Sequence, residues 1–214
     1  MERTGERVSV WQRDSVAHQR GPNVGHFVVT ALFVGIGTVV GAFGSLAVPL
    51  DFSAAFWPAQ ALQAVGGIWF GLWGGGIAAA IFPFFSNAIA GISVWVSLLF
   101  IPANFAQGMI PAWAFRRFEA DPVLKTGRDY VIWTVSGVLI ANLVGSLWSS
   151  IMLAFVTKAI PPDDWFSTWL GWFIGISVPS WILGVVRLKA LSPLAARTRV
   201  FCRGYLSDSG LQWD

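Results

Sequence analysis

The feature that most constrains this chain is a long stretch without charge. From Phe52 to Phe115 the sequence contains no Asp, Glu, Lys, Arg or His. The core of a water-soluble domain cannot hold such a segment, whereas helices of roughly 20 residues can cross a bilayer because each satisfies its own backbone hydrogen bonds. The whole chain is 55% hydrophobic and 12% charged, which is unlike a soluble domain. We therefore predict an all-α, polytopic integral membrane protein that lies in the lipid bilayer.

Glycines, prolines and isolated charges divide the chain into about six predicted transmembrane helices. The glycine run at 74–76 predicts a turn between the second and third helices, and Asp51 predicts a turn at a membrane surface. Gly37 and Gly41 form a G-x-x-x-G pair, which predicts a close helix contact in the first span. The predicted spans cover residues 27–48, 57–73, 74–87, 93–115, 130–157 and 165–186.

All lysines and arginines except Lys158 fall on one side of this six-span arrangement. Basic residues accumulate on the cytoplasmic side of membranes, so both termini are predicted to be cytoplasmic. The expected organisation is a cytoplasmic tail over residues 1–25, a six-helix membrane domain over 26–187 and a basic cytoplasmic tail over 188–214. Five basic residues at the ends of spans are predicted topology anchors: Arg116, Arg117, Arg128, Arg187 and Lys189.

Five side-chain amides interrupt the uncharged stretch and form the candidate ligand-binding site. An amide buried in hydrocarbon needs a partner, and it offers both a donor and an acceptor to a small molecule. The same residue types also join transmembrane helices by hydrogen bonds, so a structural role is the alternative for each of them. The candidates are Gln60, Gln63, Asn87, Asn104 and Gln107.

Several other functional classes lack the residues they need. No basic run interleaved with aromatic residues indicates nucleic-acid binding, and the single Cys202 excludes an internal disulfide and a multi-cysteine metal site. His18 and His26 lie outside the predicted spans, which disfavours haem or pigment ligation at mid-membrane. The sequence contains no evident nucleophile–base pair or phosphate loop, so we expect no enzyme, and it identifies no cofactor.

The order of these signals resembles the membrane-associated sensor (MASE-type) domains that precede bacterial diguanylate cyclases and histidine kinases. The resemblance covers roughly Phe27 to Leu183. It implies a helical bundle in the bacterial cytoplasmic (inner) membrane that binds a small ligand and passes a signal onward. The residues that carry it are Trp57, Pro58, Ala61, Ala64, Gly66, Gly67, the segment from Trp69 to Gly76, Asn87, Phe100, Asn104, Arg116, Arg117, Gly127, Arg128, Asp129, the segment from Trp169 to Gly175, and Pro179.

Two departures from this family pattern bear on function. Family members commonly carry an acidic residue before the glycine of the last span, where this chain has Ile174 before Gly175. The sequence after Val186 is too short for a cyclase or kinase domain, so we expect any signal to pass to a separate partner chain. Two alternatives remain. The short, glycine-interrupted spans also look like the substrate-binding S components of energy-coupling-factor vitamin transporters, and the chain could serve as a structural subunit of a larger respiratory or photosynthetic membrane complex.

Overall fold

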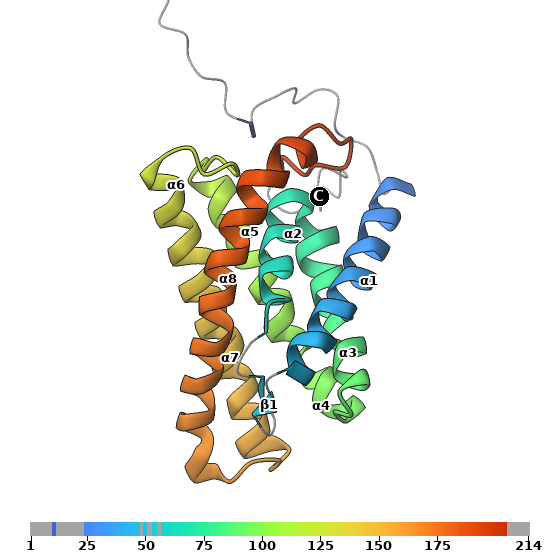
Figure 1. Cartoon of the computed structure of the whole chain (residues 1–214), viewed down its shortest axis with the longest axis vertical. Helices are drawn as coiled ribbons and strands as arrows, with labels where there is room; N and C mark the ends of the chain where they lie inside the picture. The colour runs from blue at the N-terminus through green and yellow to red at the C-terminus, as the bar shows by residue number, and fades with distance from the viewer. Residues whose placement is uncertain (1–9, 12–23, 48, 51–52, 55–56, 205–214) are drawn as a thin grey trace, which may run out of the picture.

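The computed structural model describes residues 10–11, 24–47, 49–50, 53–54 and 57–204. Within these residues the chain forms an elongated bundle whose helices run along its long axis (Figure 1). Two short strands, β1 (Pro49–Leu50) and β2 (Ser53–Ala54), pair antiparallel between the first two helices. Asp51, for which we predict a turn at a membrane surface, lies outside the described residues.

The helices are α1 (Val24–Ala47), α2 (Gln60–Gly71), π-helix η1 (Leu72–Ala78), α3 (Ala79–Ile89), α4 (Val94–Leu99), α5 (Ile101–Arg117), α6 (Gly127–Ile132), π-helix η2 (Trp133–Ile140), α7 (Ala141–Ile151), π-helix η3 (Met152–Val156), 3-10 helix η4 (Pro162–Asp164) and α8 (Trp165–Ala195).

Helical stretches that are long and apolar enough to cross a membrane make up most of the described chain. By length and composition there are five among the described residues, which confirms the predicted all-helical, multi-pass architecture. They are Val24–Gly44, Gln60–Ile89, Val94–Arg117, Gly127–Val156 and Pro162–Ala195.

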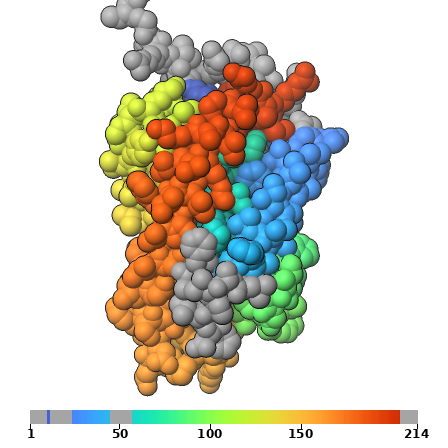
Figure 2. Space-filling model, in the orientation of Figure 1, coloured from blue at the N-terminus to red at the C-terminus, as the bar shows by residue number. Residues whose placement is uncertain are grey.

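Large apolar side chains cover the outside of the bundle. Only 22% of the most apolar part of α1 is buried within the chain, compared with 61% for the stretch Gln60–Ile89. The exposed side chains include Phe27 and Phe43 of α1 and Val178 of α8, an outer surface that suits lipid rather than water. Figure 2 shows α1 and α8 on the outside, with a narrow strip of α2 visible between them. The stretch Gln60–Ile89 therefore forms the centre of the bundle, and α1 and α8 lie at its periphery.

The stretch Gln60–Ile89 reverses direction at Gly71. The Gly71 backbone has φ 54° and ψ −129°, a conformation that residues with a Cβ rarely adopt. Gln63 Nε2 lies 3.0 Å from Ala79 O, although a straight helix would separate residues 16 positions apart by about 24 Å. The segment from η1 through α3 therefore folds back beside α2 (Figure 1).

The position of this reversal corrects the prediction that the glycines at 74–76 form the turn. These glycines lie within η1, and the single stretch Gln60–Ile89 contains the predicted span 74–87 and residues 60–73 of the predicted span 57–73. Gly74 and Gly75 instead contact the backbones of α2 and α5, where a side chain would not fit, and the turn falls at Gly71. At the other end of the chain, α8 continues to Ala195, nine residues beyond the predicted end of the last span at Val186.

Five glycines bring three backbones into direct contact at the centre of the bundle, and we call them the glycine junction. Gly66 and Gly67 lie on α2, Gly74 and Gly75 on η1, and Gly108 on α5. A Cβ placed on Gly67, Gly75 or Gly108 would overlap backbone atoms of the facing segment. No side chain can therefore separate these helices without moving them, so the junction fixes the distance between α2, η1 and α5.

The predicted G-x-x-x-G contact of the first span is confirmed. Gly37 faces the ring of Phe82, and Gly41 faces the side chain of Ser86, both on α3. A Cβ on Gly41 would come within 2.9 Å of Ser86 Oγ. Helix α1 thus packs on α3 at these two positions and also contacts α2 and η1 through Phe33 and Thr30, whereas Phe27 and Phe43 on its outer side are exposed.

Candidate ligand-binding site

Gln63 lies fully buried on α2 and uses both of its amide hydrogens within the chain. Its Nε2 donates to Ala79 O at 3.0 Å and to Asn104 Oδ1 at 3.1 Å. Ala79 O is free to accept because Pro83, four residues later in α3, has no backbone N–H to donate to it. The proline in α3 thus creates the acceptor that orients the Gln63 side chain.

Gln60 has a similar arrangement one helical turn earlier. Its Nε2 donates to Gly137 O in the π-helix η2, at 3.3 Å. In a regular α-helix the N–H of Ala141 would reach Gly137 O, but here it donates to the carbonyls of Ser136 and Val138. The end of the π-helix therefore leaves Gly137 O available, and Gln60 occupies it.

Among the described residues, the amide oxygens of Gln60 and Gln63 have no hydrogen-bond partner. Both residues are completely buried, with 0% of their surface exposed. Exchanging the oxygen and nitrogen of either amide would not help, because each nitrogen faces a backbone carbonyl that can only accept. The centre of the bundle thus contains two unpaired acceptors, each of which costs roughly 1–3 kcal/mol unless something donates to it.

Asn104 and Gln107 extend this polar centre along α5. Asn104 accepts from Gln63, and Gln107 Nε2 donates to Asn142 Oδ1 on α7 at 3.4 Å. Asn142 Nδ2 donates in turn to Ser177 Oγ on α8 at 3.1 Å. The structure therefore brings four of the five predicted amides, Gln60, Gln63, Asn104 and Gln107, onto the facing helices α2 and α5.

Asn87 does not join this group. It lies at the end of α3, where its Nδ2 donates to Ser97 Oγ of α4 at 3.2 Å. Ser97 Oγ in turn contacts Ser93 O. Asn87 therefore ties α4 to α3, which is the structural alternative that we gave for each of the five amides.

Arg116 is buried, unlike the other predicted topology anchors. Only 4% of its surface is exposed, and its two terminal nitrogens donate to backbone oxygens of Gly67, Ile68, Ala112 and Cys202. Gly67 and Ile68 belong to the last turns of α2, where carbonyls lack donors and a positive charge is favourable. Arg116 thus caps α2 and ties it to α5 and to the segment around Cys202.

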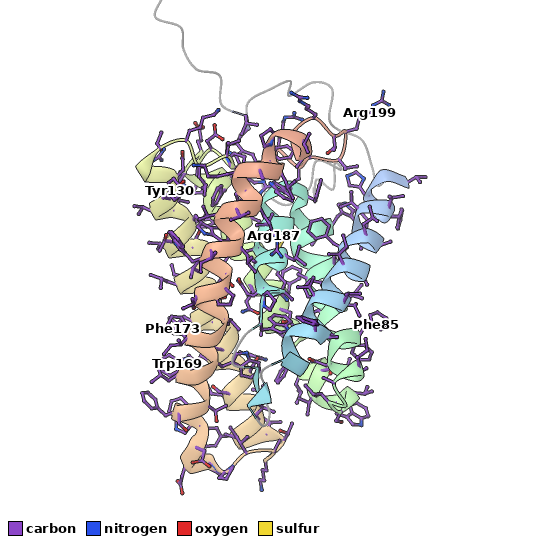
Figure 3. The ribbon with its side chains drawn as sticks, in the orientation of Figure 1. Phe85, Tyr130, Trp169, Phe173, Arg187 and Arg199 are labelled. Atoms are coloured by element: carbon purple, nitrogen blue, oxygen red, sulfur yellow. The ribbon has the colours of Figure 1, made fainter. Side chains whose placement is uncertain are left out.

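The remaining predicted anchors lie at the same end of the bundle. Arg117 is exposed, Arg128 Nη2 donates to Phe118 O at 2.7 Å, and Lys189 Nζ lies 2.9 Å from the hydroxyl of Tyr130. Arg187 differs from them because it points from α8 toward α2 (Figure 3), with Nη1 3.5 Å from Pro58 O. The common location of Arg117, Arg128 and Lys189 fits the role of orienting the chain in the membrane, and this role stays a prediction.

Sequence reasoning missed Trp133, the largest fully buried side chain among the described residues. Its ring contacts Gly137 of η2 and Gly184 of α8, and its Nε1 has no hydrogen-bond partner within the described part of the chain. Small residues at both positions were the available signal, because a large ring needs space on each neighbouring helix. Pro83 was the corresponding signal for the orientation of Gln63.

Comparisons of the chain with protein-family models, with curated proteins and with solved structures found no match.

Proposed function

We propose that this chain is a non-enzymatic membrane sensor that binds a small polar ligand among its helices and acts through a separate partner chain. One observation carries the proposal: the two unpaired amide oxygens of Gln60 and Gln63 lie fully buried at the centre of an apolar bundle. A ligand with N–H or O–H groups would satisfy both of them. Asn104 and Gln107 would complete the site. The resemblance to MASE-type domains supports the sensor role.

The ligand proposal is tested by purifying the chain from its native membrane in mild detergent and identifying the small molecules that accompany it. We expect a stoichiometric polar compound with the wild type and its loss with Asn104→Leu, because Asn104 holds the Gln63 amide in place. The matched control is Asn87→Leu, which removes a buried amide that contacts only α4. Equal recovery of the compound from both variants would retire the site.

The proteins recovered in the same purification test the partner. A kinase or a cyclase would support the sensor. Stoichiometric recovery within a respiratory or photosynthetic assembly would favour the structural-subunit alternative. An ATPase partner would favour a transporter component.

We further propose that the chain crosses the bacterial cytoplasmic membrane six times, with both termini on the cytoplasmic side. The reversal at Gly71 supports this, because the two arms of Gln60–Ile89 run in opposite directions, as parts of two successive crossings would. In a six-span chain, Val24 and Ser93 lie on opposite sides of the membrane. In a five-span chain, where Gln60–Ile89 crosses once, they lie on the same side.

Cysteine labelling of intact cells distinguishes these two topologies. Val24→Cys and Ser93→Cys are each made in a Cys202→Ser background, and both positions are exposed. We expect an impermeant maleimide to label the cysteine at position 93 from outside and the cysteine at position 24 only after the membrane is opened. The same accessibility at both positions would contradict the six-span topology.

A further inference from the structure

Arg187 places a cationic group inside the bundle without an anionic partner. Its Nη1 has a single long hydrogen bond, to Pro58 O at 3.5 Å. Among the described residues the one ion pair joins Lys125 to Asp121, and no carboxylate reaches Arg187. Charged groups within membrane proteins pair with each other or with backbone carbonyls, and they commonly mark a site for a ligand or an ion.

The depth of this contact makes the missing partner costly. Pro58 lies just before α2, whose C-terminal turn meets Arg116 and the backbone N–H of Cys202 at the basic end of the bundle. Eleven residues separate Pro58 from Trp69 in that last turn, or about 16 Å at 1.5 Å per residue. The Arg187 guanidinium therefore reaches inward from the basic end, into the interior of the bundle.

The start of α2 adds to the positive potential at this position. Ala59 precedes the helix and provides no side-chain cap, so the first N–H groups of this 12-residue helix lack a side-chain acceptor. The helix dipole contributes a partial positive charge at the same end. In transporters, the N-terminal ends of broken transmembrane helices commonly point toward an anionic group.

Two fully buried polar atoms near this end of α2 have no hydrogen-bond partner among the described residues. They are Oε1 of Gln60, the first residue of the helix, and Nε1 of Trp133. The two residues are neighbours, because Gln60 donates to Gly137 O and the Trp133 ring packs on Gly137. The same ring packs on Gly184, one helical turn before Arg187 on α8. One unpaired acceptor and one unpaired donor thus lie on residues close to Arg187 and the start of α2.

We propose that Arg187 and the N-terminal turn of α2 bind an oxyanion, a carboxylate or a phosphate, carried by a lipid headgroup or by a soluble molecule. The guanidinium forms a two-pronged contact with the oxyanion, as arginine does with carboxylates and phosphates. The Trp133 N–H supplies a further donor, and Gln60 Oε1 accepts from a hydroxyl or amine on the same ligand. This inference rests on the proposed ligand-binding function and specifies the chemical class of the ligand.

The test uses the full chain in micelles of a sugar-based detergent, which carry no phosphate or carboxylate, and measures its thermal midpoint of unfolding. One arm adds sodium acetate or sodium phosphate against sodium chloride at equal ionic strength. The other arm adds phosphatidylglycerol to the micelles. We expect a rise of about 4 °C in one arm, which identifies a soluble or a lipid source for the oxyanion. Arg187→Gln removes that rise, and Arg117→Gln, which changes an exposed arginine, retains it.

Absence of a rise in both arms would overturn the inference, as would an equal rise in the Arg187→Gln variant. If the glutamine variant does not fold, Arg187→Lys decides the question, because lysine keeps the charge but loses the two-pronged contact. A co-purified neutral ligand that depends on Asn104 but not on Arg187 would contradict this inference and leave the proposed function intact.

Discussion

Replacing Gly108 with alanine is expected to destabilise the bundle more than any other single methyl group added to the chain. The new Cβ would overlap the backbone of Gly75 at the glycine junction, and no flexible side chain is there to move aside. The helices α5 and η1 must separate, at a cost of about 3 kcal/mol or more. Thermal unfolding in detergent should show a midpoint lower by about 10 °C.

Gly35→Ala is the matched control for this variant. Gly35 lies in α1, and nothing lies within 4 Å of a Cβ placed there. Alanine also favours a helix over glycine by up to about 1 kcal/mol, so this variant is expected to be as stable as the wild type or slightly more stable. An unchanged midpoint for Gly108→Ala would mean that the three backbones are not in contact at the junction.

Arg116→Leu is expected to have the second largest effect. The substitution leaves the carbonyls of Gly67 and Ile68 at the end of α2 without their donors and releases the segment around Cys202. Hydrogen bonds to a charged group contribute roughly 1.5–3 kcal/mol, and several are lost together, so we expect a loss of about 3 kcal/mol. The free energy of unfolding in mixed micelles measures this loss.

The neighbouring arginine provides the control. Arg117→Leu removes the same charge from the adjacent residue, but Arg117 is exposed, so we expect a change within about 0.5 kcal/mol. Equal losses for the two variants would indicate that removing a positive charge matters, and that the capping contacts of Arg116 do not.

The four amides on α2 and α5 were predictable from the sequence, because amide side chains are uncommon in an apolar stretch and must find hydrogen-bond partners there. Gln60 and Gln63 are one turn apart on one helix, as Asn104 and Gln107 are on another, so each pair shares a helix face. Asn87 has the same chemistry and was grouped with them. Its pairing with Ser97 depends on where α3 ends, which local sequence does not specify.

The turn at Gly71 and the different roles of the two arginines were not predictable in the same way. Several glycines in a short segment all permit a turn, and tertiary contact with α5 decides which of them are used for packing. Arg116 and Arg117 are chemically identical, and only the rotation of α5 about its axis buries one and exposes the other. These choices depend on contacts between residues far apart in the chain.

An experimental density map of the chain purified from its native membrane, at a resolution that shows ordered water, would test the central claim most directly. We predict multi-atom density for a ligand within hydrogen-bonding distance of Gln60 Oε1 and Gln63 Oε1. Density for water alone, or direct pairing of both oxygens with other residues of the chain, would contradict the claim. The amides would then serve only to hold the helices together.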